Sequence, residues 1–81
     1  MDTKETGMLL ARISLVDNRQ ASVETIRVWQ EILVDTDYED AVEAVIRHWR
    51  TSDQWIKPVH IVEGAKIVNR ERRKKTYGRL E

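Results

Sequence analysis

The side chains that could carry chemistry in this sequence are two histidines, an acidic cluster and a basic segment. His48 and His60 are the only histidines, and eleven residues separate them. A zinc site needs three or four ligands, so we interpret both as ordinary, partly exposed side chains and expect no bound metal. The sequence contains no cysteine, which excludes a disulfide scaffold and thiolate-ligated zinc and suits a reducing cytosol.

The acidic cluster lies in the middle of the chain and consists of Asp35, Asp37, Glu39, Asp40 and Glu43. A calcium loop beginning at Asp35 would need Gly at its sixth position and Glu at its twelfth. Those positions hold Asp40 and Ile46, so the calcium motif fails. We interpret the cluster as a capped helix start that complements the helix dipole. The alternative is an acidic contact surface for a basic partner.

No catalytic or cofactor-binding pattern is present in the sequence. The glycines Gly7, Gly64 and Gly78 are scattered, so no glycine-rich loop cradles a phosphate. No serine, threonine or lysine has the arrangement of base and oxyanion donors that nucleophilic catalysis requires. We therefore expect a protein that is not an enzyme and that has no cofactor.

The sharpest functional signal is the segment that follows Val68, where the apolar pattern stops. Its candidate partner-binding residues are Arg70, Arg72, Arg73, Lys74, Lys75 and Tyr77. These cations could contact nucleic-acid phosphates or an acidic protein groove, where arginines form bidentate pairs. The third interpretation is a solvated helix end. Charge alone does not separate these three interpretations.

The formal charge of the 81-residue chain is zero but unevenly divided, with −6 over residues 1–45 and +6 over residues 46–81. Such a chain has an acidic end and a basic end, each able to meet an oppositely charged partner. No apolar run is long enough to span a membrane, and the polar start at Met1 does not resemble a secretory signal. We expect a cytoplasmic protein.

The elements that must position these residues are helices. Apolar residues recur at helical spacing over about 3–16, 23–33, 38–49 and 58–68, with Ser22 and Asp37 as N-caps and Pro58 in a first turn. The pattern predicts an all-α fold: a compact bundle of three to four short helices. Residues 1–68 form the domain, and residues 69–81 form a basic, partly disordered tail or a projecting helix end.

Three tryptophans provide much of the apolar area in this short chain. Trp29 and Trp49 fall on helical core stripes, so we expect both in the core. Trp55 lies in a connector before Pro58. We expect its ring to plug the core from outside, because a small domain needs the buried area. The alternative for Trp55 is an exposed binding anchor.

Residues 29–45 read WQEILVDTDYEDAVEAV: a Trp in the middle of one helix, a Leu and an Asp, a short turn, and a Tyr-Glu pair that opens the next helix. Pro58 and Ile61 follow. This pattern resembles the phage replicative-helicase loader-and-inhibitor family of small helical proteins. The resemblance covers residues 8–68 loosely and residues 26–45 best.

The resemblance implies a phage protein that acts in the host cytoplasm and binds a hexameric DnaB-type replicative helicase through its C-terminal part. An origin-binding protein is a possible second partner. The alternative function is a small DNA-binding regulator, of helix-turn-helix or excisionase-like type, that uses the basic C-terminal segment. Against it, the helix beginning at Tyr38 has an acidic start that phosphates would repel. For an adaptor we expect only weak, non-specific nucleic-acid binding and no membrane association.

Overall fold

The computed structural model describes the backbone of residues 1–78 and the side chains of residues 1–74. The described residues form four helices, which are α1 (Thr3–Asp17), α2 (Val23–Ile32), α3 (Tyr38–Thr51) and α4 (Pro58–Gly78). The expected all-α class is therefore confirmed. None of the described helices is long and apolar enough to cross a membrane.

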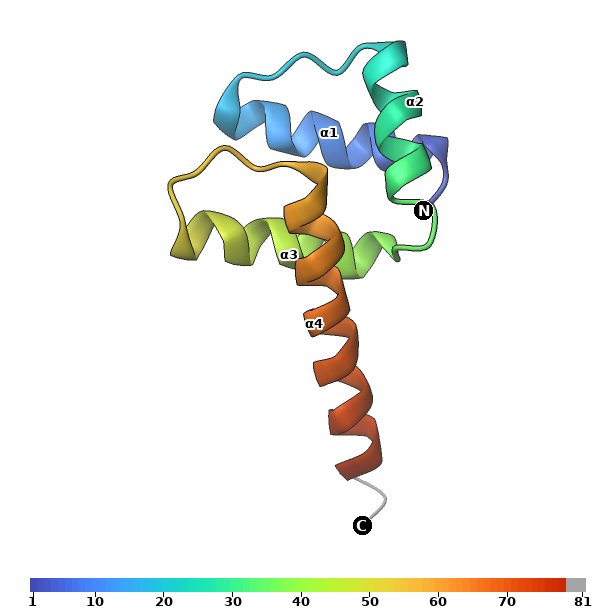
Figure 1. Cartoon of the computed structure of the whole chain (residues 1–81), viewed down its shortest axis with the longest axis vertical. Coiled ribbons are helices and arrows are strands. Elements are labelled where there is room, and N and C mark those ends of the chain that lie inside the picture. The colour runs from blue at the N-terminus through green and yellow to red at the C-terminus, as the bar shows by residue number, and fades with distance from the viewer. Residues whose placement is uncertain (79–81) are drawn as a thin grey trace.

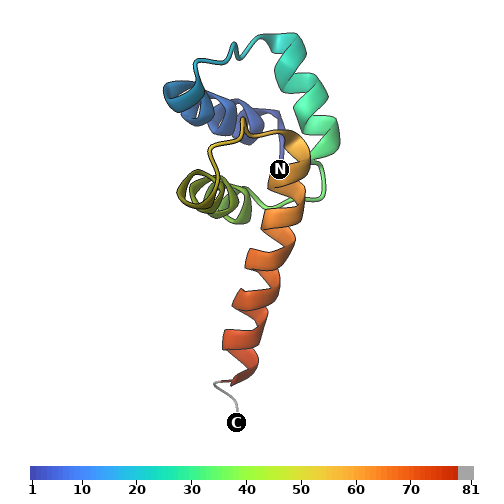
Figure 2. The same cartoon turned by 60° about the vertical axis from the view of Figure 1, so that its left-hand side comes forward.

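The four helices are arranged as two crossed pairs (Figure 1). α1 and α3 lie side by side, while α2 and α4 run across them at a steep angle. The view in Figure 2 shows the same arrangement and shows that the C-terminal half of α4 extends away from the other three helices. The basic segment therefore continues as a projecting helix as far as Gly78.

Local hydrogen bonds explain where α1, α2 and α4 begin. Asp2 and Glu5 form a capping box, in which the Glu5 N–H donates to Asp2 Oδ1 at 2.8 Å and the Asp2 N–H donates to Glu5 Oε1 at 3.1 Å. The Ser22 hydroxyl accepts from the Thr25 N–H at 3.2 Å. At α4, His60 Nδ1 accepts the Lys57 N–H at 2.9 Å, which is the role that Glu or Gln has in a capping box.

Asp37 lies at the N-cap position of α3, as expected, but its side chain makes no capping hydrogen bond. It turns instead towards Arg72 of α4, with 3.5 Å between the carboxylate and the guanidinium. The expected capping role of this side chain is therefore wrong, because a cation from a distant helix attracts the carboxylate away from the α3 backbone.

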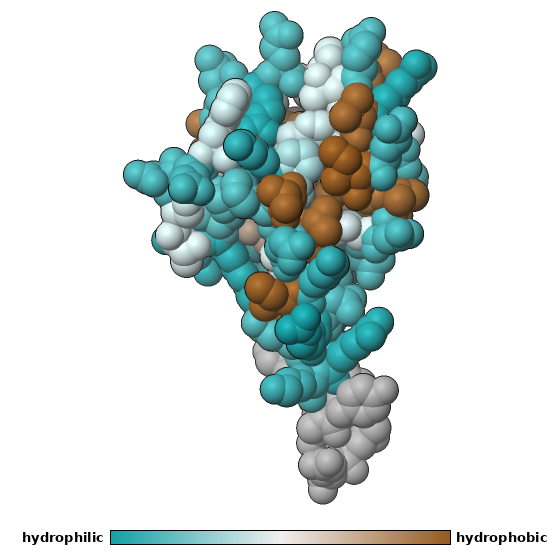
Figure 3. Space-filling model, viewed as in Figure 1, coloured by the Kyte–Doolittle hydropathy of each residue, from teal (hydrophilic) through white to brown (hydrophobic). Residues whose placement is uncertain are grey.

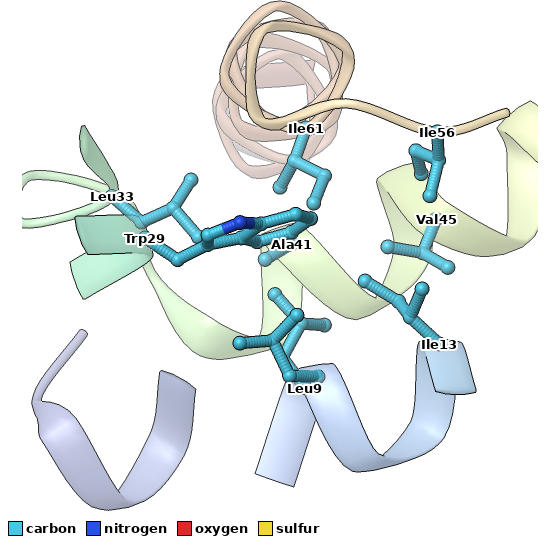
Figure 4. Packing of buried hydrophobic residues seen from close by; sticks show 9 residues of the cluster. Leu9, Ile13, Trp29, Leu33, Ala41, Val45, Ile56 and Ile61 are labelled. Carbon is cyan, nitrogen blue, oxygen red and sulfur yellow. The ribbon is translucent and has the colours of Figure 1, made fainter. Parts of the chain in front are cut away.

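The core lies where the helix pairs meet (Figure 4). The indole of Trp29 lies between Ile61 of α4 on one side and Ala41 and Leu9 on the other, and only 7% of the Trp29 surface is exposed. The core cluster consists of Leu9, Leu10, Ile13, Trp29, Leu33, Ala41, Val45, Ile56 and Ile61. Every helix contributes to this cluster, so burial of its apolar surface, worth about 1.5–3 kcal/mol for each large side chain, holds the fold together.

The other two tryptophans differ from expectation to different degrees. Trp49 packs against the core but is only partly buried. Trp55 is 59% exposed, so the expectation that it plugs the core is wrong. The neighbouring Ile56 is completely buried in its place. The segment before Pro58 is not helical, and adjacent side chains of such a segment point to opposite sides, so only one of this pair faces the core.

The crossing of α3 and α4 depends on a close approach at Gly64. A Cβ atom added at Gly64 would lie 2.8 Å from the Ala44 Cβ, which is closer than carbon atoms can pack. Gly64 lowers helix propensity, yet here it lets the two helix backbones meet. Gly7 is the contrasting case, because a Cβ there would meet only Ile26 Cδ1 at 3.5 Å, an ordinary contact distance.

These two glycines form a matched pair for a stability test. We expect Gly64→Ala to destabilise the fold by about 1–3 kcal/mol through overpacking, despite the better helix propensity of Ala. Gly7→Ala should stabilise it by roughly 0.5–1 kcal/mol, because it lies inside α1 with room for the methyl group. Urea unfolding of both variants measures the two effects. Equal and favourable effects would show that α3 and α4 do not meet at Gly64.

Candidate functional site

The basic residues of α4 lie on two different sides of the helix. Arg72 follows Ala65 by seven residues, which is two helical turns, and therefore lies on the side that packs against α3. Lys66, Arg70 and Arg73 are spaced by four and three residues and share a neighbouring, outer side, which faces the turn between α2 and α3. The cations that follow one another in the sequence thus divide into two groups. Arg72 occupies an inner position against α3, and Lys66, Arg70 and Arg73 form what we call the outer stripe.

Arg72 belongs to the folded body of the protein. Its guanidinium lies 3.2 Å from the Asp40 carboxylate, 3.5 Å from Asp37 and 3.8 Å from Glu39. The Asp40 side chain is only 4% exposed. It also accepts a hydrogen bond of 3.0 Å from the Asn69 side-chain amide. A buried carboxylate needs such partners, so Asn69 and Arg72 compensate the charge that α3 buries.

A second contact joins the same two helices at Arg47. Its guanidinium donates to both carboxylate oxygens of Glu71, at 3.1 and 2.9 Å, and its Nε donates to Glu43 at 2.9 Å. These hydrogen bonds raise the pKa of Arg47 above its ordinary value. The pairs are half exposed, so each contributes little to stability. The apolar pattern ends at Val68. The contacts of Arg47 with Glu71 extend the packing of α4 on α3 by about one turn beyond that residue.

The outer stripe borders a groove of about 610 Å³. The groove lies between the end of α2, the turn that leads into α3, and α4. Ile32, Val62 and Ala65 provide its apolar lining, while Lys66, Arg70 and Arg73 line it on the α4 side. Asp35 and Asp37 line the side across from α4, on the turn between α2 and α3.

The structure therefore divides the predicted partner-binding residues. Arg70 and Arg73 are exposed beside the groove, and Lys74 is exposed on the same helix. Arg72 is held by α3. Lys75 and Tyr77 lie outside the residues whose side chains the structure describes. Lys66 was not among the predicted residues, although its spacing of four residues from Arg70 was the signal that could have revealed it.

The acidic cluster contacts the chain itself rather than a metal. Asp37, Glu39 and Asp40 surround Arg72, and Glu43 pairs with Arg47. Asp35 lines the groove. Among the described residues, no three His, Asp or Glu side chains are grouped closely enough to hold a metal ion. The cluster therefore opens α3 and pairs with cations of the same chain, and the interpretation as a contact surface for a basic partner stays a prediction.

The two histidines lie against each other. The rings of His48 and His60 stack with 4.6 Å between their centroids and an interplanar angle of 23°. His48 Nε2 lies 2.8 Å from the Gln54 carbonyl oxygen, which fixes that nitrogen as a donor. His60 Nδ1 accepts from the Lys57 N–H and is therefore unprotonated. The pair closes the loop between α3 and α4.

Trp55 stacks on a guanidinium at the same end of the molecule. The Arg19 side chain lies 4.4 Å from the Trp55 ring centroid and 5.2 Å from that of Trp29. Arg19 also pairs with Asp17 at 3.2 Å and donates to the Ile56 carbonyl. Cation–π contact of this kind is attractive, so Arg19 links the exposed Trp55 ring to the body of the protein.

No protein-family model, curated protein or solved structure matches this chain.

Two arginines, two residues apart, test the division of α4 into an inner and an outer side. We expect Arg72→Ala to destabilise the fold by about 1–3 kcal/mol, because the buried Asp40 carboxylate loses its cation. Arg70→Ala, two residues earlier, should change stability by less than about 0.5 kcal/mol. Thermal and urea unfolding measure both. If the two variants unfold alike, Arg72 does not hold α4 on α3.

The histidine pair should make stability depend on pH. Burial, together with the positive charges of His48 and Lys57, lowers the pKa of His60 from its ordinary value of 6.5. As the pH falls below 6.5, the unfolded chain therefore takes up a proton before the folded chain does, and stability decreases until the pH passes below the folded pKa.

The control for this pH effect is His60→Gln. Glutamine at this position can still accept the Lys57 N–H but does not titrate. We expect the melting temperature of the wild type to fall more steeply than that of His60→Gln between about pH 7.5 and pH 5, with the two curves converging at the higher pH. Parallel curves would contradict a titrating His60 cap.

Proposed function

We propose that this protein is a non-enzymatic adaptor of phage DNA replication that binds a DnaB-type hexameric helicase and loads or inhibits it. The observation that carries the proposal is the outer stripe of α4. Lys66, Arg70 and Arg73 are exposed on one side of a projecting helix, whereas the neighbouring Arg72 is used by the fold. Cations that the fold does not require are available for a partner.

Two further features support an adaptor. The resemblance of residues 26–45 to the loader-and-inhibitor family falls on α2 and α3, the hairpin that supplies Trp29 and Ala41 to the core. An adaptor also needs a stable body and separate contact surfaces rather than catalytic residues. The exposed stripe on α4 and the exposed Trp55, which stacks on Arg19, provide two surfaces of different chemistry.

An acidic protein surface suits the outer stripe better than DNA does. Asp35 and Asp37 lie across the groove from Arg70 and Arg73, where they would repel a phosphate backbone that approached the arginines. Side-chain carboxylates of a protein partner can instead reach the arginines singly, as bidentate pairs. The remaining competitor is the small DNA-binding regulator, which would use the same cations for phosphate contacts.

The test is co-sedimentation of the full chain with purified DnaB-type hexamers at ~0.15 M salt, where contacts that depend only on screened surface charge are weak. We expect the double variant Arg70→Ala/Arg73→Ala to lose helicase binding while keeping its fold. The control is Arg12→Ala/Arg27→Ala, which removes the same charge from exposed positions of α1 and α2. This control should bind as the wild type does.

A DNA-retention assay at the same salt separates the two functions. The adaptor should bind duplex DNA with a micromolar or weaker Kd and a steep dependence on salt, as non-specific contacts do. Tight, sequence-dependent retention of DNA, or a wild-type protein that does not bind the helicase, would reject the adaptor and leave the DNA-binding regulator as the better account. Helicase binding that both double variants preserve would reject the outer stripe as the contact surface.

A further inference from the structure

The groove beside the outer stripe continues into a larger apolar surface. Figure 3 shows apolar side chains gathered over α2 and the N-terminal half of α4 on this face of the molecule. Val28 lies one turn before Ile32 on α2, and Val59 lies one turn before Val62 on α4. Val28 and Val59 are each 55% exposed, and Ile32 is 47% exposed. Clustered aliphatic side chains that remain this exposed mark an interaction surface.

The charges around this surface are unequal. On the α4 side, Arg70 and Arg73 form no ion pair with any carboxylate among the described residues, and Lys66 has only a long, exposed contact of 3.9 Å with Glu63. On the opposite side, Asp37 is paired with Arg72, whereas Asp35 forms no ion pair among the described residues, so the acidic edge of an occupant must face α4. The groove therefore offers an apolar floor and a basic edge that the fold leaves without carboxylate partners.

We propose that this groove receives an amphipathic helix of the partner protein, whose apolar stripe covers Val28, Ile32 and Val59 and whose acidic edge pairs with Arg70 and Arg73. The inference rests on the proposed adaptor function and names the chemistry of its partner. Along α4, the surface from Val59 to Arg73 is roughly 21 Å long at 1.5 Å per residue, so a helix of about four turns covers it.

Charge complementarity distinguishes this occupant from a second copy of the chain. A second copy would have to bring carboxylates to Arg70 and Arg73. Its densest acidic region, at the start of α3, is already occupied by its own Arg72, which contacts Asp37, Glu39 and Asp40. A partner helix with its own acidic edge meets no such competition.

The direct probe is a fluorescent 14-residue helical peptide with leucines at i, i+3 or i+4, and i+7, and with glutamates along one edge only, the edge that would face Arg70 and Arg73. Its binding to the full chain is measured by anisotropy at ~0.15 M salt. The double variant Val28→Gln/Ile32→Gln should weaken binding at least about tenfold, because two half-exposed aliphatic side chains no longer pack on the leucines. Arg70→Ala/Arg73→Ala should weaken it by a similar factor.

The matched control is Val23→Gln. Val23 is on the same helix, is 62% exposed, and lies nine residues from Ile32, which places it on the opposite side of α2. This variant should bind the peptide within about twofold of the wild type, since glutamine preserves helix propensity. Circular dichroism confirms that each variant is folded.

Three outcomes would overturn the inference. The first is a peptide that does not bind the wild type, and the second is a peptide that binds Val28→Gln/Ile32→Gln as well as the wild type. The third is sedimentation equilibrium that shows a dimer which Val28→Gln/Ile32→Gln dissociates, because the occupant would then be a second copy. Helicase binding is measured separately, so a failed peptide test with intact helicase binding rejects the groove and leaves the adaptor function standing.

Discussion

The structure depends on the pairing of one buried carboxylate with a cation from the far end of the chain. Asp40 lies in the first turn of α3, where its charge also suits the helix dipole, and it is almost completely buried. Asn69 and Arg72 supply its hydrogen bonds from α4. Together with the Gly64–Ala44 approach, this contact sets where α4 crosses α3 and therefore which of its cations face outwards.

The Asp40–Arg72 pairing explains why a chain with no net charge still has a basic surface. Four carboxylates around the start of α3, those of Asp37, Glu39, Asp40 and Glu43, pair within the chain with Arg72 or Arg47. The outer cations of α4 keep their charge available beside an apolar groove. The basic half of the sequence thereby contributes its outer cations to a surface that is basic along α4 and apolar in the groove beside it.

The sequence predicted the helices well, because the Ser22 cap, the first-turn position of Pro58 and the apolar period are local signals. It named Arg72 as a binding residue and did not predict its pairing with Asp40, because that carboxylate is 32 residues away, although Arg72 continues the spacing of Ile61 and Ala65. The histidine pair and the outward turn of Trp55 were missed for the same reason: they depend on how the loop between α3 and α4 packs. Of the six predicted binding residues, Arg70, Arg73 and Lys74 are exposed on α4. Arg72 is half exposed but pairs with α3, while Lys75 and Tyr77 lie outside the described side chains.

Native-state amide hydrogen exchange tests the central claim most directly, because it locates the end of the cooperatively folded body in the free protein. The sequence pattern alone places that end near Val68 and predicts fast exchange from about Glu71 onwards. The Asp40–Arg72 contact predicts that amides of α4 remain protected through Arg72, and that Arg72→Ala removes this protection while Arg70→Ala does not. Fast exchange from Asn69 in the wild-type protein would contradict the account.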